Sequence, residues 1–495
     1  MMRVKITLAI LIALSMMLFA GLIDEVHMKS HQIKSHIGKL GLLWEADTNE
    51  GFFEKFERFD VTLSEVMEKL CGYRDLPEEV KSKIANYLKN LKNFGQRFNG
   101  KIQPLEMVTT DDMIMSSFIL LEPEDIIEKT FYRLEPIRDQ YLHGSCWAFS
   151  TTGMFESAYA IQVLENSEGN VDNSVDFSER WVAFHNIDWD VLYNNLIVFD
   201  RIVIQDRNSL EGGNPYFASY NAIRYGMIDE ECAPYSDVYI TTEEVIPLPP
   251  QAYGAPRIRS NKTIMIPDAE TAKDLGYSYS EYINMIKTAI KEFGSLSVAF
   301  DVPSDFFYYN KGIYTPSTDK FEGGHAVTLV GWVDAKDLDD VILASKVNPN
   351  ATPILDEEIS EYEFYDPTRD GTYTATLFWI IKNSWGYEWG DGGYYVVPAI
   401  TEDAYDNKDV SKWMIEYDLM YVSVFDSEEK HENVNLDING DGRVDMKDFE
   451  TLISKVGSTD PEDIAICDIS YPKDGKINSD DVSTWIYLYN KAKEK

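Results

Sequence analysis

The chain has 495 residues, and its 45 Lys and Arg against 84 Asp and Glu give a formal net charge of −39. An apolar fraction of 44% with 30 Tyr and 24 Phe is typical of a folded protein, and the length predicts two to four structural units. The charge argues against a nucleic-acid partner, because a phosphate-binding surface needs clustered Lys and Arg that this sequence lacks.

Residues 1–23 have the pattern of a secretory signal peptide. Arg3 and Lys5 precede an uncharged, mostly apolar run from Ile6 to Ile23. A signal anchor is the alternative, because the run is almost long enough to span a bilayer and the small-residue cleavage motif is weak. We therefore expect a secreted protein, with membrane attachment only if this segment is an uncleaved anchor.

Residues 24–125 are charged and helical in pattern, and they hold no convincing catalytic cluster. Apolar residues recur at helical spacing from Leu76 to Leu91, behind an acidic first turn. Because the segment lies between a signal and a domain with a candidate nucleophile, we expect an inhibitory pro-segment. An additional domain is the alternative.

Residues 126–425 combine one apolar helix with several later strands. The helix begins at Cys146, directly after a polar, glycine-containing stretch that starts at Gln140. Runs rich in Val, Ile and aromatic residues at 296–300, 326–332 and 377–382 read as strands. A helix followed by a sheet predicts an α+β domain.

Cys146 has the surroundings expected of a nucleophile. A helix N-terminus presents unpaired backbone N–H groups and a partial positive charge, which favour a thiolate over a thiol. His325, expected at the start of a buried strand, would act as base and acid, and Asn383 would orient its imidazole. Taken singly, each residue is more often structural, as a buried cysteine, a core histidine or a turn asparagine. The prediction therefore depends on their conjunction and order.

Together these motifs resemble the papain family of cysteine peptidases, from about residue 131 to residue 397. The matching stretches are Gln140 six residues before the cysteine, Ser145-Cys-Trp-Ala-Phe-Ser150, Gly212-Gly213 followed by Pro215, Cys232-Ala-Pro-Tyr235, Gly324-His-Ala-Val327, Lys382-Asn-Ser-Trp-Gly386 and Trp389-Gly-Asp-Gly-Gly-Tyr394. The resemblance implies a two-lobed fold, with Cys146 on a helical lobe facing His325 and Asn383 on a β-rich lobe. It also implies endopeptidase action on polypeptides through an acyl-enzyme, with no cofactor for catalysis.

The resemblance assigns roles to further residues. The side-chain amide of Gln140 would stabilise the oxyanion beside the backbone N–H of Cys146. Gly212 and Gly213 would let an extended substrate pair closely with the main chain. Trp385 would cover the hydrogen bond between asparagine and histidine, with simple core packing as an equal alternative.

Two departures from the family pattern stand out. His143 and Leu210 occupy the places of a disulfide that the family usually has near the nucleophile, so packing must hold this loop instead. The intervals from the cysteine to the histidine and the asparagine exceed the roughly 130–150 residues expected. Insertions at Tyr239–Gly276 and Asp334–Thr376 are expected to form surface excursions near the cleft.

A short polar linker at 426–432 leads to a small acidic unit at 433–495. The loop from Asp437 to Asp448 has oxygen side chains at positions 1, 3, 5, 9 and 12 and Gly442 at position 6, as a Ca²⁺ loop requires. A second loop starts at Asp468 and has two extra residues, which leaves its affinity open. The expected ligands are Asp437, Asn439, Asp441, Arg443, Asp445 and Asp448 in the first loop, and Asp468, Asp474, Asn478 and Asp481 in the second.

The tandem loops and the Asp at position 12 resemble a type I dockerin module. This resemblance implies a structural Ca²⁺ that the unit needs to fold, and a cohesin-containing partner on a scaffold or cell surface. The sequence thus predicts a secreted cysteine endopeptidase tethered by its tail. A non-catalytic peptide-binding protein is one alternative, and an amidase or transpeptidase using the same acyl-enzyme is another.

Overall fold

The computed structural model describes most of the chain, in the ranges 21–97, 118–119, 130–164, 175–187, 205–206, 212–238, 247–425, 435–469, 475–478, 481–482, 484–486 and 489. Most of the expected signal and the whole expected linker lie outside these ranges. Within them, no helix combines the length and apolarity needed to cross a bilayer.

Within residues 21–97, the N-terminal segment contains the α-helices α2 (Leu22–Leu40), α3 (Glu50–Glu54), α4 (Leu63–Leu70) and α5 (Glu78–Arg97), a 3-10 turn at Glu57–Phe59 and the strand β1 (Trp44–Ala46). Helix α4 starts at a capping box, in which Thr62 and Glu65 exchange side-chain and backbone hydrogen bonds. Strand β1 pairs with β8 (Tyr309–Gly312), so this segment joins the β-rich lobe through backbone hydrogen bonds. The helical content agrees with the sequence pattern.

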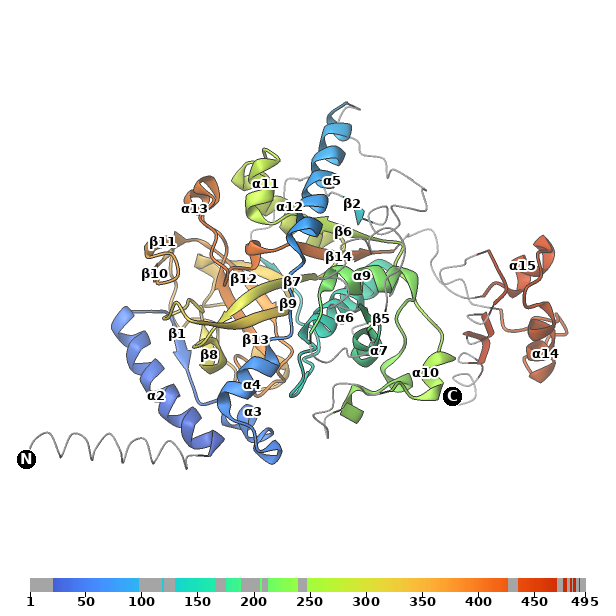
Figure 1. Cartoon of the computed structure of the whole chain (residues 1–495), viewed down its shortest axis with the longest axis horizontal. Coiled ribbons are helices and arrows are strands. Elements are labelled where there is room, and N and C mark those ends of the chain that lie inside the picture. Colours follow the sequence, from blue (N-terminus) through green and yellow to red (C-terminus); the bar gives the residue numbers. More distant parts are fainter. Residues whose placement is uncertain are drawn as a thin grey trace, which may run out of the picture.

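The helical lobe is organised around α6 (Cys146–Tyr159), with α7 (Glu179–Phe184) and α9 (Pro215–Arg224) beside it (Figure 1). Every residue of α6 is buried. A helix that is enclosed on all sides has no polar face, and apart from Glu156 the residues of α6 are apolar, small or hydroxyl-bearing. Its N-terminus is therefore held rigidly between the two lobes.

The β-rich lobe is built on an eight-stranded sheet with the order β13-β12-β9-β7-β14-β6-β2, in which β3 also pairs with β9. The strands are β2 (Phe118–Ile119), β3 (Phe131–Tyr132), β6 (Lys262–Ile266), β7 (Leu296–Pro303), β9 (Phe321–Asp334), β12 (Leu377–Lys382), β13 (Tyr394–Pro398) and β14 (Met420–Val424). The three strands predicted from composition are β7, β9 and β12, and they are neighbours in the sheet. Mixed helix and sheet content agrees with the predicted α+β class.

The first expected insertion, 239–276, is only partly an excursion. It contains the short helices α10 (Pro250–Tyr253) and α11 (Ala269–Asp274), but also β6, which pairs antiparallel with β14. The expectation of a surface excursion is wrong for β6, because its apolar side chains complete the main sheet.

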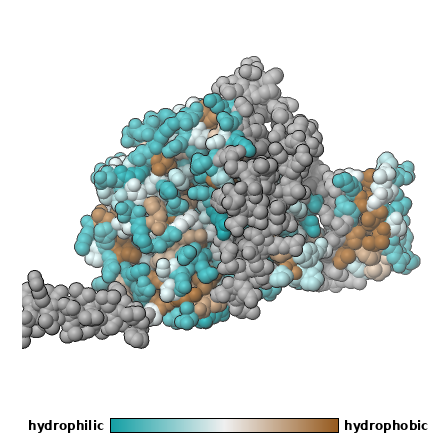
Figure 2. Space-filling view, viewed as in Figure 1, coloured by the Kyte–Doolittle hydropathy of each residue, from teal (hydrophilic) through white to brown (hydrophobic). Residues whose placement is uncertain are grey.

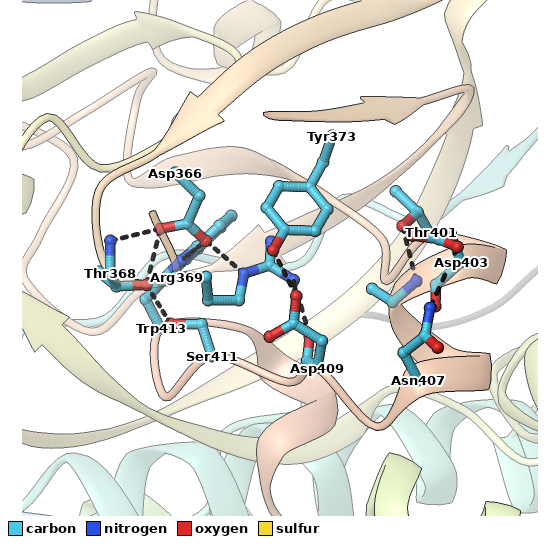
Figure 3. A network of polar contacts seen from close by, with 11 residues as sticks. Asp366, Thr368, Arg369, Tyr373, Thr401, Asp403, Asn407, Asp409, Ser411 and Trp413 are labelled. Carbon is cyan, nitrogen blue, oxygen red and sulfur yellow. Dashed lines mark hydrogen bonds and ion pairs between the residues drawn. The ribbon is translucent and has the colours of Figure 1, made fainter. Parts of the chain in front are cut away.

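The second insertion, 334–376, ends in a hairpin of β10 (Tyr362–Asp366) and β11 (Gly371–Ala375). Figure 1 places this hairpin near β1 and away from α6, the helix that begins at Cys146. Asp366 anchors it by accepting hydrogen bonds from Arg369 Nε at 2.7 Å and Trp413 Nε1 at 2.8 Å (Figure 3). Because Arg369 also donates to the Asp409 carbonyl, the hairpin is fixed to the loop that precedes β14.

The remaining helices and strands of the main body are α12 (Tyr279–Glu292), α13 (Glu402–Asn407), β4 (Asn186–Ile187) and β5 (Gln205–Asp206). The tail contains α14 (Met446–Lys455) and α15 (Pro461–Cys467). It has a core of its own, formed by Ile438, Leu452, Cys467, Ile469, Ile477 and Trp485.

Candidate active site

Cys146 is the first residue of α6 and is fully buried. Its Sγ lies 3.4 Å from the backbone nitrogen of Ala326, which donates to it. Ala326 directly follows His325 in β9, so the sulfur and the histidine meet where the helical lobe abuts the sheet. Residues separated by almost two hundred positions are thereby brought together.

His325 and Asn383 form a direct hydrogen bond, with 2.7 Å between Nε2 and Oδ1. The same Oδ1 accepts the backbone N–H of Ser384 at 2.8 Å, which fixes the amide with its oxygen towards the histidine. Because Nε2 must donate in this arrangement, the other ring nitrogen is left as the proton acceptor. His325 lies inside β9, which begins at Phe321, and not at the start of a strand as expected.

Trp385 lies beside this hydrogen bond and is fully buried. Its ring is 4.7 Å from that of His325, and it stacks on Phe307 at 4.9 Å with only 8° between the planes. Phe52 of the N-terminal segment stacks on it as well, at 5.7 Å. Trp385 therefore contacts the ring of His325, and it also packs against core aromatic residues. The expected covering position and the core-packing alternative are both compatible with this arrangement.

The Gln140 side chain is held at both ends. Its Oε1 accepts from Ser384 Oγ at 2.7 Å, and its Nε2 donates to the carbonyl oxygens of His143 at 2.7 Å and Leu70 at 3.2 Å. The amide is thus fixed in orientation, with its Nε2 donating to a carbonyl oxygen of the N-terminal segment.

The nucleophile loop is held by hydrogen bonds to a tyrosine. The Tyr235 hydroxyl donates to the Gln140 carbonyl at 2.9 Å and lies 2.6 Å from Ser145 Oγ. Buried His143 places Nε2 3.0 Å from the Val238 carbonyl. All four cysteines lie within the described ranges and none is in a disulfide. Packing was expected to hold this loop in place of the bridge, and Tyr141, Leu142 and Trp147 are indeed buried, but these hydrogen bonds hold it as well.

The stretch of the N-terminal segment that follows α4, residues 71–74, lies between the two lobes beside the active-site residues. Gly213 donates to the Gly72 carbonyl at 2.9 Å and accepts from the Arg74 N–H at 2.8 Å, and Tyr73 donates to the Gly324 carbonyl at 3.0 Å. Tyr73 therefore lies between one glycine of each lobe, parallel to the chain at Gly213. The chain's own segment makes the main-chain contacts that were expected of a substrate.

Glycine is required on both sides of this contact. A Cβ on Gly72 would lie 2.0 Å from the Gly144 carbonyl oxygen. At Gly212 the backbone has φ +137, and a Cβ there would lie 2.9 Å from the Gly72 oxygen. The segment and the Gly212-Gly213 turn thus approach more closely than side chains would allow.

Burial controls the ionisation of the pair in this closed state. It raises the pKa of Cys146 to about 11, although the Ala326 and Gly72 amides and the first amides of α6 act in the opposite direction. Burial also lowers the pKa of His325 to about 4, partly offset by Asn383 and the Leu70 carbonyl. The expected thiolate is therefore not the stable form here, because the loss of solvent outweighs the helix N-terminus.

Buried charges between the lobes were not found from the sequence. Lys382, next to Asn383, pairs with Glu135 at 2.9 Å. Burial raises the pKa of Glu156 on α6 to about 7 and that of Glu230 to about 8. No local pattern marks these residues, since their chemistry arises only when α6 and the sheet exclude water.

The first acidic loop of the tail is closed by its own carboxylates. Asp437 accepts the backbone N–H groups of Asp441 at 3.0 Å and Gly442 at 2.8 Å, while buried Asp448 accepts those of Asn439 at 3.1 Å and Asp445 at 2.8 Å. Arg443 also lies in this loop, and its N–H donates to the Asp441 side chain at 3.0 Å.

The second acidic loop repeats this pattern where it is described. Asp468 accepts the N–H of Gly475 at 2.9 Å, and buried Asp481 accepts those of Ile469 at 2.7 Å and Asn478 at 2.8 Å. Asp474 lies outside the described residues. The two loops therefore share one pattern of carboxylate-to-backbone hydrogen bonds. Among the residues described, no group of three His, Cys, Asp or Glu side chains is arranged to hold a metal, so any ion here would need amide and carbonyl oxygens too.

Comparison with known proteins gives one family match. Residues 123–411 match the family model described as papain family cysteine protease. Cysteine proteinase 2 of Dictyostelium discoideum is 28% identical over 287 residues, which cover 56% of this chain and 62% of that protein. Cathepsin B-like CP2 of Giardia intestinalis is 25% identical over 311 residues, covering 63% of this chain and 75% of that one. Among solved structures, procathepsin B S9 from Trypanosoma congolense is 16% identical with a TM-score of 0.42, covering 80% of this chain and 97% of that chain.

Proposed function

Because the chain belongs to the papain family of cysteine proteases, we propose that it is a cysteine-type endopeptidase that hydrolyses polypeptides through an acyl-enzyme. The observation that supports the proposal is the buried hydrogen bond between His325 and Asn383, together with the Cys146 sulfur on the backbone N–H of Ala326, the residue after His325. Since the chain spans only 62% of the Dictyostelium protein, the activity is a property to be tested on this chain itself.

In this proposal each residue has a step. Cys146 transfers its proton to His325, and the sulfur attacks the carbonyl carbon of the substrate. Gln140 Nε2 and the Cys146 backbone N–H stabilise the oxyanion. His325 then protonates the departing amine, which leaves a thioester, and afterwards takes a proton from the water that hydrolyses it. Asn383 keeps the imidazole in the tautomer that these transfers need.

We further propose that residues 24–125 keep the enzyme latent. Gly72 and Tyr73 occupy the main-chain contacts that a substrate needs, and the Leu70 carbonyl takes the Gln140 donor. Burial beneath this segment also disfavours the ionised pair of Cys146 and His325, because it raises the pKa of the thiol and lowers the pKa of the imidazole. Removal of the segment would readmit water and substrate together.

The test uses purified chain before and after removal of the pro-segment. A thiol-directed epoxide should label the processed protein, and the processed protein should cleave an unfolded polypeptide. Cys146→Ala should lose both labelling and cleavage, whereas Cys232→Ala, which removes a thiol of the same lobe, should keep both. Equal turnover by the Cys146→Ala variant would contradict the proposal.

For the tail we propose a structural Ca²⁺ and a cohesin-type partner. The donor set of the first loop consists of oxygen atoms, which suits Ca²⁺, and the Asp448 carboxylate is fully buried, where an acidic group is costly without a compensating charge. Asp437, Asn439, Asp441, Arg443, Asp445 and Asp448 would hold the ion in the first loop, and Asp468, Asp474, Asn478 and Asp481 in the second. When bound, the ion neutralises these carboxylates and stabilises the fold of the unit.

An exposed apolar surface supports a binding role for the tail. Met446 and Ile453, one heptad apart on α14, are 53% and 46% exposed, and Ile466 on α15 is 52% exposed. Figure 2 shows apolar colour gathered on this small unit. A protein secreted through its N-terminal signal and attached by this surface to a scaffold or cell-surface protein would account for the module. Pull-down of the full chain by a cohesin domain, with and without a chelator, tests it, and binding unchanged by the chelator would contradict the role given to Ca²⁺.

A further inference from the structure

The two ends of the Asn383 side-chain amide differ in how they are held. Its Oδ1 is 2.7 Å from His325 Nε2 and accepts the backbone N–H of Ser384 at 2.8 Å. Its Nδ2 is buried and has no hydrogen-bond partner among the described residues. A buried amide N–H without a partner is costly, so we expect an acceptor beside it.

A small cavity lies beside this asparagine, where α6 meets β9 and β12. Its volume is about 10 Å³, which is about the space that one water molecule needs. Four of the side chains that line it can form hydrogen bonds to a water: Lys382 at the end of β12, Asn383 next to it, Thr328 of β9 and Glu156 of α6. A buried water makes about three hydrogen bonds, so the cavity offers the partners that a water requires.

The polar groups of the cavity wall have hydrogen-bonding capacity to spare. Glu156 is 8% exposed, and its Oε1 accepts the Phe177 N–H at 2.8 Å, while its other oxygen has no hydrogen-bond partner among the described residues. The Lys382 ammonium is 2.9 Å from the Glu135 carboxylate, and its two remaining N–H groups can donate elsewhere. A water in the cavity could therefore accept from Lys382 and Asn383 and donate to Glu156.

A glycine on α6 keeps this space open. Gly153 lies three residues before Glu156, on the same face of the helix, and it also lines the cavity. A Cβ on Gly153 would lie 3.0 Å from Lys382 Nζ and 3.1 Å from Thr328 Oγ1. A side chain at position 153 would thus crowd two of the polar groups that a water would contact.

We propose that this cavity holds one water molecule, which accepts a hydrogen bond from Asn383 Nδ2 and donates one to Glu156, so that Glu156 is a positioning residue for Asn383. The amide is then held at both ends and cannot turn its N–H groups towards His325. A turned amide would present a donor to Nε2, and the imidazole would lose the tautomer in which its other nitrogen accepts the thiol proton. The proposal rests on the peptidase function proposed above, and it adds a residue of α6, the helix that carries Cys146, to the machinery that orients the base.

The kinetic test uses the processed enzyme and a peptide substrate. Glu156→Leu removes both carboxylate oxygens, and we expect kcat to fall about tenfold, the effect of one lost orienting hydrogen bond, with KM changed less than about twofold. The control is Thr152→Val, which removes a buried hydroxyl of the same helix that does not line the cavity, and it should keep kcat.

A double-mutant cycle separates positioning from packing. In an Asn383→Ala background, Glu156→Leu should lower kcat by less than about twofold, because the group through which Glu156 acts has been removed. If Glu156→Leu lowered kcat equally in both backgrounds, its role would be packing alone, and the proposal would be overturned. An unchanged kcat in the Glu156→Leu single variant would overturn it as well.

A crystal structure of the full-length Cys146→Ala chain does not depend on turnover or on how well Glu156→Leu folds. We expect density for one water within about 3.2 Å of both Asn383 Nδ2 and a Glu156 oxygen. A cavity without that water would overturn the proposal even if the unmodified enzyme cleaves peptides. If the water is present and the unmodified enzyme cleaves no peptide, the peptidase function fails while the water site stands.

Discussion

The active-site cleft and the first acidic loop of the tail differ in how far apart along the chain their residues lie. The cleft joins Gln140, Cys146, His325 and Asn383 from both lobes, and the pro-segment covers them. The acidic loop is contained between Asp437 and Asp448 and closes on its own backbone. A local loop can be recognised by spacing alone, whereas a site assembled from distant segments takes its charge state from whatever covers it.

Removing the group that orients the base should have the largest effect on the cleft. Asn383→Ala deletes the 2.7 Å bond to His325, so the imidazole loses its fixed tautomer. We expect kcat/KM of the processed enzyme to fall about 100-fold, a part of the roughly 10²–10⁴ that acid–base catalysis supplies. The rate of peptide hydrolysis gives kcat/KM. The control is Asn348→Ala, which changes an exposed asparagine elsewhere in the chain. An unchanged rate would show that the asparagine is structural.

A side chain added at Gly72 should weaken the binding of the N-terminal segment and expose Cys146 to labelling. In Gly72→Ala the new Cβ would meet the Gly144 carbonyl at 2.0 Å. Overpacking costs about 1–3 kcal/mol, so labelling of Cys146 in the full chain should rise about 5- to 150-fold. Gly38→Ala is the matched control, because a Cβ there meets nothing within 4 Å. Equal labelling of both variants would contradict the latency proposal.

The folding of the tail unit should depend on Ca²⁺ and not on whether the N-terminal segment has been removed. Asp448→Asn keeps the shape of a buried side chain but removes its charge, and we expect Ca²⁺ affinity to fall at least about tenfold. Circular dichroism during calcium titration measures this. Glu450→Gln removes one exposed charge from the same helix and should leave the titration unchanged. If adding a chelator left the circular dichroism of the unmodified chain unchanged, the proposed calcium site would be contradicted.

The partly buried carboxylate of Glu230 should produce a smaller effect, one of pH on stability. Burial raises the pKa of Glu230 from 4.5 to about 8, so between these values the folded state retains a proton that the unfolded state has lost. Its contribution to the free energy of unfolding therefore decreases as pH rises from about 4.5 to 8.

Glu230→Gln isolates this effect, because the amide can still accept the Tyr235 N–H that the carboxylate accepts at 2.6 Å. The free energy of unfolding of the variant, minus that of the unmodified chain, should be about 1–2 kcal/mol larger at pH 8 than at pH 5. This value is discounted for the partial exposure of Glu230. Denaturant unfolding at the two pH values measures the difference. If the variant and the unmodified chain differed in stability by the same amount at pH 5 and at pH 8, burial would not have raised the pKa of Glu230.

The sequence by itself determined the candidate nucleophile, base and orienting asparagine, the three central strands, and the acidic loops, because these depend on local pattern and motif order. Only the tertiary structure decided that Glu156 and Asn383 line one cavity, that β6 completes the sheet, and that the β10–β11 hairpin lies away from α6. It also decided the protonation of the catalytic pair: the helix N-terminus at Cys146 predicts a thiolate, yet the pro-segment excludes the water that would stabilise it. Burial is a property of segments distant in the chain, and no window of sequence around the cysteine contains it.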